Sequence, residues 1–483
     1  MQNESLKNKA LMGMVWKAVE KISGTGISFI IGVILARILM PTDYGLIGML
    51  AIFFAFTELF IDSGFSSALI QKKDRTDVDY STIFYFNLIV SVLLYVLLFF
   101  LAPLIASFFN TPQLSLLTRV LSLNILINSL SLVQQTRLTI NLEFRPQAFV
   151  SLLCVIISGS IGVLMAYQGF GVWALVIQNI SSSIIRTSLY FYINKWVPLW
   201  VFSVSSFKQL FSYSSKLLGA GFVGAIFNNI YSLLIGKIFN ARDVGFYTRA
   251  KQFPQLLSDL ITSILQGVTF PIMTSIQDDR NRLVSVYGRL MRMIFFFVIP
   301  VLTLFALLTE PFVRLLLTEK WMPVIPLIQW LCFARMITPI SSLNMNILNT
   351  IGRSDLFFKV DMVKIPLAII ALIITIPLGL MAVVIGHFIT TFISFFINAY
   401  YPGKIFGFGA RKQIMEMKLT VYATLIMSVC VFLMMKVLPG DFLKLLICIP
   451  IGLAIFMFAS YLMKNDGVKE VVVLVNSIYA KRK

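Results

Sequence analysis

The chain has 483 residues, of which 58% are hydrophobic and only 13% are charged, and its mean hydropathy is +0.88. A water-soluble domain cannot bury that much apolar surface, so the composition excludes a soluble fold and predicts an all-α integral membrane protein. The net charge of +19 would suggest a nucleic acid partner in a soluble protein. Here the basic residues lie in short loops, so we expect no nucleic acid partner and interpret the charge as membrane topology and contact with anionic membrane lipid.

The apolar segments predict about fourteen transmembrane helices, because a helix needs about 20 apolar residues to cross a bilayer. The first segment is too long for a cleavable signal peptide and has no small-residue cleavage site, so we expect it to stay in the membrane. In chain order the segments lie near 14–39, 45–70, 83–108, 114–134, 147–167, 170–192, 212–239, 245–270, 290–318, 323–349, 357–377, 380–401, 419–438 and 442–463.

Lysine and arginine alternate between the two sides of these predicted helices. The connection "QKKDRTD" at 71–77 carries three basic residues, and the chain ends in "KRK" at 481–483. The opposite connections, such as "YQGFG" at 167–171 and "LPGD" at 438–441, are short and carry few basic residues, namely Arg37, Arg242, Lys320 and Lys436. Because cytoplasmic loops hold the excess of basic residues, both termini are predicted to be cytoplasmic.

One corner of the chain occurs twice. The segment "ILARILMPTDYGLIGM" at 34–49 returns as "LIGKIFNARDVGFYTR" at 234–249. We expect the shared aspartates to cap the start of the next helix and the shared glycines to permit a tight return of the chain. These residues are Asp43 and Gly45 in the first segment, and Asp243 and Gly245 in the second.

A second pair of similar segments, "NLEFRPQAF" at 141–149 and "NTIGRSDLF" at 349–357, follows in the same order. Together the matches predict a duplication of six helices. Because six is even, the two pseudo-symmetric lobes enter the membrane from the same side, an arrangement that favours transport by alternating access. The predicted lobes are 1–192 and 212–402, joined by a cytoplasmic linker at 193–211 and followed by two further helices and a cytoplasmic tail at 403–483.

The N-terminal motifs resemble a known family. The segments "SLKNKALMGMVWKAVEKI" at 5–22, "GVILARILMPTDYGLIGM" at 32–49 and "GFSSALIQKKD" at 64–74 are similar to polysaccharide exporters of the MOP superfamily. The likeness is closest to the Wzx-type flippases of lipopolysaccharide and colanic acid biosynthesis. The motif match is densest over 5–75, while the length, the number of helices and the duplication extend it over the whole chain.

The resemblance implies a V-shaped pair of lobes and a function. Such proteins move undecaprenyl-pyrophosphate-linked oligosaccharides, the repeat units of O-antigen, capsule or exopolysaccharide, from the inner to the outer leaflet of the bacterial inner membrane. The resemblance also implies association with polysaccharide polymerase and chain-length proteins. We expect the chain to function as a monomer.

Ionisable and amide side chains within the predicted helices are candidate site residues, because a charge at the bilayer centre costs about 2.5–3.5 kcal/mol or more. A wet, net-positive cavity would compensate a crossing pyrophosphate, whose oxygens the arginine fork binds, while amides would bind sugars. Mutual neutralisation of acids and bases inside the bundle is the alternative. The candidates for the cavity are Arg119, Arg186, Lys216, Arg249, Lys251, Arg335, Asn124, Asn128, Asn179 and Asn228, with Asn229 beside them.

Three acids are candidates for binding a coupling cation, H⁺ or Na⁺. Glu58 and Asp62 are four residues apart and share one helix face, and Asp259 lies on the helix that the duplication aligns with theirs. No other cofactor and no metal is expected. We expect His387 to be a hydrogen-bonded interior residue rather than a proton relay.

Two other functions compete with glycan export. A drug or metabolite antiporter of the MATE type would share the two lobes, but it usually has about twelve spans and a more acidic cavity. A polysaccharide polymerase or ligase would need a large external loop with catalytic residues, whereas the external loops here are short. GxSxG, HExxH and P-loop motifs are absent from the sequence, so we do not expect an enzyme.

Overall fold

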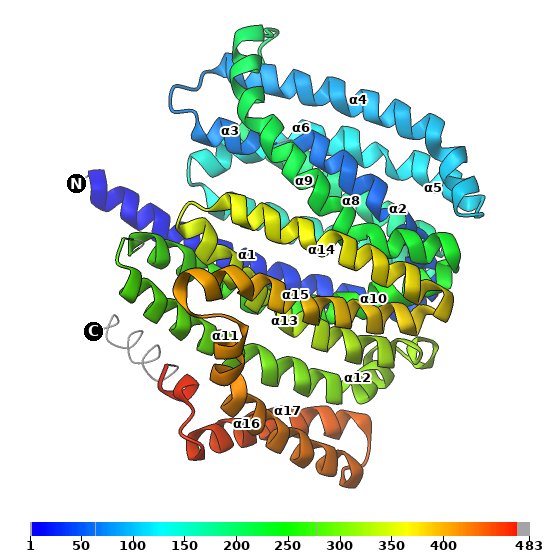
Figure 1. Ribbon diagram of the computed structural model, residues 1–483. Helices are drawn as coiled ribbons and strands as arrows, with labels where there is room; N and C mark the ends of the chain where they lie inside the picture. Colours follow the sequence, from blue (N-terminus) through cyan, green and yellow to red (C-terminus); the bar gives the residue numbers. More distant parts are fainter. Residues whose placement is uncertain (1, 63, 277, 471–483) are drawn as a thin grey trace. The chain divides into compact units, whose positions relative to one another are not determined.

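The computed structural model describes residues 2–62, 64–276 and 278–470, and within these ranges the chain is helical and contains no strand (Figure 1). The predicted all-α fold is confirmed. The chain divides into two compact units, Met1–Gly245 and Phe246–Lys483. The first unit contains α1 (Gln2–Ile38), α2 (Pro41–Asp62), α3 (Phe65–Gln71), α4 (Asp77–Phe108), α5 (Gln113–Leu121), α6 (Leu123–Ile140), α7 (Phe144–Tyr167), α8 (Val172–Asn194), α9 (Val204–Ile238) and the first turn of α10 (Ala241–Ser275).

The second unit contains the rest of α10 and seven further α-helices within its described residues. These are α11 (Arg280–Leu307), α12 (Thr309–Leu316), α13 (Val324–Thr350), α14 (Ser354–Thr375), α15 (Leu380–Phe406), α16 (Ala410–Val437) and α17 (Asp441–Leu462).

The protein is a multi-pass membrane protein. In the described residues, 11 helical segments are long and apolar enough to cross a bilayer. The helices α8, α9 and α10 are not among them, although they are 23, 35 and 35 residues long. The total of fourteen crossings therefore stays a prediction.

Three predicted spans each include two helices in the structure, although 45–70 and 114–134 still lie within single membrane-crossing segments, Pro41–Gln71 and Gln113–Ile140. The segment 45–70 is broken at Gly64, whose φ of 74° is a left-handed conformation that stops a helix and favours glycine. The segment 114–134 is broken at Ser122, and the segment 290–318 at Leu308. Hydropathy locates an apolar segment but does not detect an interruption of the helix inside it.

The same helix pairs recur in the two units, as a duplication requires. In the first unit α4 packs on α6, α6 on α8, and α7 on α8. In the second unit the equivalent pairs are α11 on α13, α13 on α15, and α14 on α15. The helix α9 packs against α2 and belongs to the first compact unit. The predicted lobes were defined by similarity between sequence segments, whereas the compact units are defined by contacts in space. The predicted lobe boundaries therefore stay a prediction.

The last two helices, α16 and α17, pack against each other and against α11. Their shared core includes Phe296, Met427, Cys448 and Phe456. A buried polar network also ties α16 to the preceding helices, because Gln413 Nε2 donates to Tyr287 Oη (3.1 Å), Asn344 Oδ1 (3.0 Å) and the backbone carbonyl of Phe408 (3.0 Å).

The structure corrects our expectation for the repeated corner. Asp43 accepts a hydrogen bond from the backbone N–H of Met40 (2.8 Å), but at the second corner the cap of α10 is Asn240, whose Oδ1 accepts from the N–H of Asp243 (3.0 Å). The glycines also have another role. A Cβ at Gly45 would lie 1.5 Å from the carbonyl oxygen of Ala241, and a Cβ at Gly245 would lie 1.8 Å from that of Pro41.

This contact is reciprocal, since each glycine faces the helix start of the other copy of the corner. The glycines therefore allow α2 and the first turn of α10 to cross backbone against backbone, and they do not serve a tight return of the chain.

We expect Gly45→Ala to destabilise the protein, because its methyl group overlaps a backbone carbonyl that cannot rotate away. Overpacking costs about 1–3 kcal/mol, and a backbone clash costs more. Gly26→Ala is the matched control, since a Cβ at Gly26 meets nothing within 4 Å. The measurement is thermal unfolding in detergent. Equal unfolding temperatures for the two variants would contradict the proposed crossing.

Replacing Asn344 by leucine should lower the free energy of unfolding by about 1–3 kcal/mol, because it leaves the buried Gln413 amide and Tyr287 hydroxyl without their shared partner. Thr424→Val is the control, since Thr424 bonds only the carbonyl of Thr420 in its own helix. Denaturant or thermal unfolding of both variants tests this prediction. An unchanged free energy of unfolding in Asn344→Leu would show that the network contributes little to stability.

Candidate substrate-binding site

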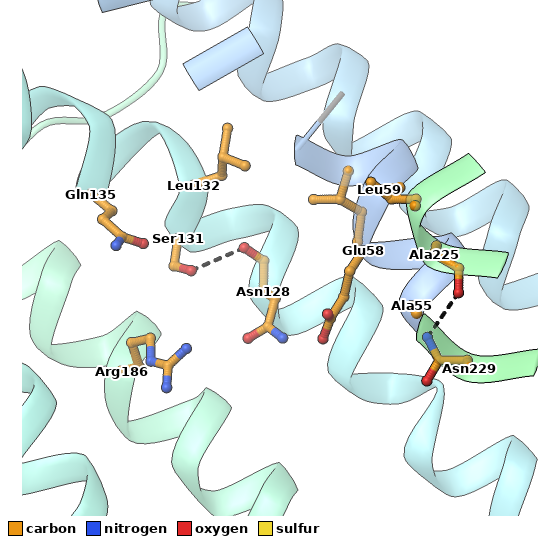
Figure 2. A pocket seen from close by; sticks show the side chains of 12 residues that line it. Ala55, Glu58, Leu59, Asn128, Ser131, Leu132, Gln135, Arg186, Ala225 and Asn229 are labelled. Carbon is orange, nitrogen blue, oxygen red and sulfur yellow. Dashed lines mark hydrogen bonds between the residues drawn. The ribbon is translucent and has the colours of Figure 1, made fainter. Parts of the chain in front are cut away.

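A pocket of about 730 Å³ lies within the first unit, between α2, α6, α8 and α9 (Figure 2). Its volume is in the range of sites that take a molecule of several rings. Two charged and four uncharged polar side chains line it beside small and aliphatic residues. The lining consists of Ala55, Glu58, Leu59 and Ile61 from α2, Asn128, Ser131, Leu132 and Gln135 from α6, Arg186 from α8, and Gly224, Ala225 and Asn229 from α9.

Helix periodicity explains the polar face of α6. Asn128, Ser131 and Gln135 are separated by three and four residues, so they lie on one face of the helix. Ser131 Oγ donates to the backbone carbonyl of Asn128 (2.9 Å). Asn128 Oδ1 is buried and has no hydrogen-bond partner in the described part of the chain. This face of α6 therefore presents polar groups whose hydrogen-bonding capacity is not filled by the described part of the protein.

The position of Arg186 follows from the packing of α8 on α6. Thr187 Oγ1, from the next residue along α8, donates to the backbone carbonyl of Ile127 (3.0 Å), which precedes Asn128. This bond fixes the register of the two helices, so that Arg186 faces the polar side of α6. The small residues Gly224 and Ala225 on α9 leave room opposite.

Glu58 and Arg186 point into the pocket from opposite sides, with Asn128 between them in Figure 2. Both residues are exposed. The positive charge of Arg186 acts on the Glu58 carboxylate, yet no ion pair within 4.0 Å joins these two described side chains. The pocket is thus close to neutral overall, with its two charges held apart by the helices that carry them.

A second group of charges lies in the second unit. Lys251, Gln255 and Asp259 repeat every four residues and share one face of α10. Arg335 of α13 donates from Nη2 to Gln255 Oε1 (3.2 Å), and both Lys251 and Arg335 interact electrostatically with Asp259. The cavity role expected for Lys251 and Arg335 and the cation-binding role expected for Asp259 stay predictions.

His387 of α15 lies beside this second group and is half-buried. Its imidazole interacts electrostatically with Arg335 and Lys251. Its backbone carbonyl accepts hydrogen bonds from Thr390 (3.0 Å) and Thr391 (2.7 Å). The expected hydrogen-bonded interior role of its imidazole stays a prediction.

The other predicted site residues are dispersed. Arg119 of α5 is outside the pocket lining: its Nε donates to the carbonyl of Phe99 (3.3 Å), and its guanidinium lies 4.5 Å from the centre of that ring. Asn124 precedes Asn128 by one turn of α6, and Asn179 precedes Arg186 by about two turns of α8. Arg249 is buried and donates to Gln252 (2.5 Å). The side chains of Asp62, Lys216 and Asn228 lie outside the described residues.

Sequence reasoning missed Ser131 and Gln135. Both sit at helical spacing from Asn128, and this spacing is the signal that could have found them. The prediction considered ionisable and asparagine side chains one at a time and did not extend the periodic face. In the described residues no group of three or more His, Cys, Asp or Glu side chains is placed to hold a metal ion.

Comparison with known proteins gives the family. The sequence profile of the family described as "Polysaccharide biosynthesis protein" matches residues 34–326. The chain belongs to this family. The pocket lining from α2, α6, α8 and α9 falls within the matched region, as do Lys251 and Asp259 of α10.

Curated relatives carry names from the same field. The chain is 24% identical over 441 residues to the lipopolysaccharide biosynthesis protein WzxC of Escherichia coli, covering 90% of each chain. It is 25% identical over 359 residues to the teichuronic acid biosynthesis protein TuaB of Bacillus subtilis, covering 74% of each.

Two solved structures show the same fold. The lipid II flippase MurJ in an inward closed conformation matches with a TM-score of 0.74 at 17% identity, covering 94% of this chain and 99% of MurJ. A multidrug resistance MATE family transporter of the MOP superfamily, in an inward-facing conformation, matches with a TM-score of 0.62 at 16% identity, covering 80% and 98%. These likenesses confirm the expected MOP-type fold.

The pocket should be reachable by water-soluble reagents. We expect Gln135→Cys to react with a charged thiol reagent at least about tenfold faster than Ser129→Cys, because accessible thiolates react and buried ones do not. Gln135 is exposed and lines the pocket, whereas Ser129 is 1% exposed and pairs with Ser91 (3.0 Å). Both variants are made with Cys430, the half-buried native cysteine, replaced by serine. Similar rates would show that the pocket is closed to water.

Proposed function

We propose that this protein is a flippase that moves lipid-linked oligosaccharides, repeat units of a surface polysaccharide, from the inner to the outer leaflet of a bacterial inner membrane. One observation carries the proposal: a membrane protein of the polysaccharide biosynthesis family holds a pocket lined by charges, amides and a hydroxyl within its helices. The names of the relatives and the flippase fold support the same function.

The chemistry of the pocket suits this cargo. A glycan headgroup cannot cross hydrocarbon unaided, because each unsatisfied polar group costs several kcal/mol there. The amides of Asn128, Gln135 and Asn229 replace water around sugar hydroxyls, and the guanidinium of Arg186 offers a fork of N–H donors to anionic oxygens. The polyprenyl chain remains in the lipid throughout.

Alternating access is the proposed transport mechanism, with both termini in the cytoplasm and the monomer as the working unit. The positive-inside distribution of lysine and arginine supports this orientation. Polysaccharide polymerase and chain-length proteins are the proposed downstream partners, since a flipped repeat unit must be polymerised before export. We propose a transporter and not an enzyme, because the family relatives bear transport and biosynthesis names and the flippase fold is shared.

A cation gradient is the proposed energy source. Glu58 and Asp259 are the candidate acids, with Asp62 beside Glu58 in the sequence, and H⁺ or Na⁺ are the candidate ions. Flipping that proceeds equally well with and without pH and Na⁺ gradients would remove this part of the proposal.

Small-molecule antiport is the second candidate. It is favoured by the fold shared with the MATE family transporter. The base-rich group of Lys251 and Arg335 favours an anionic cargo over the cationic compounds expected of a drug antiporter.

The decisive experiment uses the purified full chain in lipid vesicles containing a fluorescent polyprenyl-pyrophosphate-linked oligosaccharide. An impermeant reductant bleaches only the outer leaflet, so empty vesicles lose half of the signal. Vesicles with a flippase lose nearly all of it, because the uncatalysed crossing of a charged headgroup is slow. A parallel assay with a cationic dye tests the antiporter.

We expect Arg186→Gln to slow flipping about tenfold or more, since a hydrogen bond to a charged group contributes about 1.5–3 kcal/mol. Arg145→Gln is the matched control, because Arg145 is exposed and stacks on the Trp16 ring outside the pocket. Wild-type vesicles that protect half of the glycan label but extrude the dye would replace the proposed function by antiport.

A further inference from the structure

The two charges of the first-unit pocket differ from several ion pairs of this chain. In those pairs the acid contacts the base directly: Lys72 contacts Asp79 at 2.7 Å, Arg292 contacts Glu416 at 3.2 Å and Arg353 contacts Asp355 at 2.8 Å. Glu58 and Arg186 are close enough to interact electrostatically, but they form no such contact. The two charged groups therefore face the pocket without neutralising each other by direct contact.

Helix packing holds Glu58 and Arg186 apart. Arg186 is fixed on α8 by the neighbouring hydrogen bond from Thr187 to α6, while Glu58 is carried by α2, which packs mainly against α9. Asn128 lies between the two side chains in Figure 2. The space between the charges belongs to the pocket and can admit a ligand group.

We propose that Glu58 is the resident counter-ion of Arg186, and that an anionic group of the cargo takes over this role when it binds. This inference rests on the proposed function. In the empty pocket the carboxylate balances the guanidinium through space, so neither charge is left without compensation in a region of low dielectric. When the cargo anion binds Arg186, Glu58 repels it and limits its affinity.

Limited affinity is useful in a transporter. A site must bind its cargo well enough to take it from one leaflet, and weakly enough to release it into the other. An arginine alone in such a pocket would hold a diphosphate too tightly, because charge-assisted bidentate bonds are among the strongest polar contacts in proteins. Glu58 therefore acts as a release element, and it does so without touching the cargo.

The cargo anion has two chemical sources, the diphosphate of the lipid carrier and the carboxylate of an acidic sugar. Both present paired oxygens that a guanidinium can bind through two N–H groups. The pocket does not distinguish them by charge alone, so the experiment uses inorganic pyrophosphate and glucuronate as separate probes.

The experiment compares the wild-type chain with Glu58→Gln in detergent, measuring the dissociation constant of each probe by calorimetry. We expect Glu58→Gln to bind one of the probes about three- to fiftyfold more tightly, the range that Coulomb repulsion gives between water and a protein interior. In vesicles the same variant should flip the lipid-linked glycan more slowly at saturating cargo, because release becomes slower.

Three further variants make the result specific. Glu58→Asp keeps the charge and should stay near the wild-type affinity, which separates charge from folding defects. Glu143→Gln removes an exposed acid at the start of α7 and should change nothing. Arg186→Gln should bind the probes about tenfold or more weakly, measured as a higher dissociation constant.

Each outcome has a meaning. Tighter binding of pyrophosphate alone assigns the anion to the lipid carrier, and tighter binding of glucuronate alone assigns it to the glycan. Unchanged or weaker binding of both probes in Glu58→Gln overturns the counter-ion role, even if the wild type flips the glycan. Tighter anion binding in a protein that flips no lipid-linked glycan keeps the counter-ion role and rejects the proposed function.

Discussion

Polar groups within a bilayer must find partners inside the protein, and this requirement governs the structure. Most hydroxyl side chains in the helices meet it locally by donating to a carbonyl one turn earlier, as Thr82 does to Val78 (2.7 Å) and Thr424 does to Thr420 (2.7 Å). Larger groups meet it across helices, as in the network of Tyr287, Asn344 and Gln413. Polar residues satisfied in this way stabilise helix packing and leave nothing for a ligand.

In the pocket of the first unit, polar groups that lack full partners within the protein gather around one cavity. Asn128 keeps a buried amide oxygen without a partner, and Glu58 and Arg186 keep their charges apart. Side chains that lack a hydrogen-bond or ion-pair partner within the protein are expected at functional sites. The same side chains would be a liability in a membrane anchor, whereas in a transporter they replace the hydration shell of the cargo.

Backbone packing supplies the frame for this site. At Gly45 and Gly245 two helix starts touch so closely that any side chain would overlap a carbonyl oxygen. The contact joins the two similar segments of the sequence, 34–49 and 234–249, at their helix starts. Helix α9, which follows the first six-helix repeat, completes the pocket by packing against α2.

The sequence by itself determined the membrane environment, the helical fold, the repeat and the family, because apolar length, loop charge and short motifs are local properties of the chain. It also indicated Glu58, Asn128 and Arg186 as residues in need of an explanation, since charge and amide groups within apolar segments are visible without a structure.

Only the tertiary structure decided which of them share a pocket. Arg119 was chosen by the same rule as Arg186, yet it packs on Phe99 while Arg186 lines the cavity. The helix breaks at Gly64, Ser122 and Leu308 were likewise undetermined, and so was the crossing role of Gly45, which depends on contacts between distant segments that hydropathy and spacing do not encode.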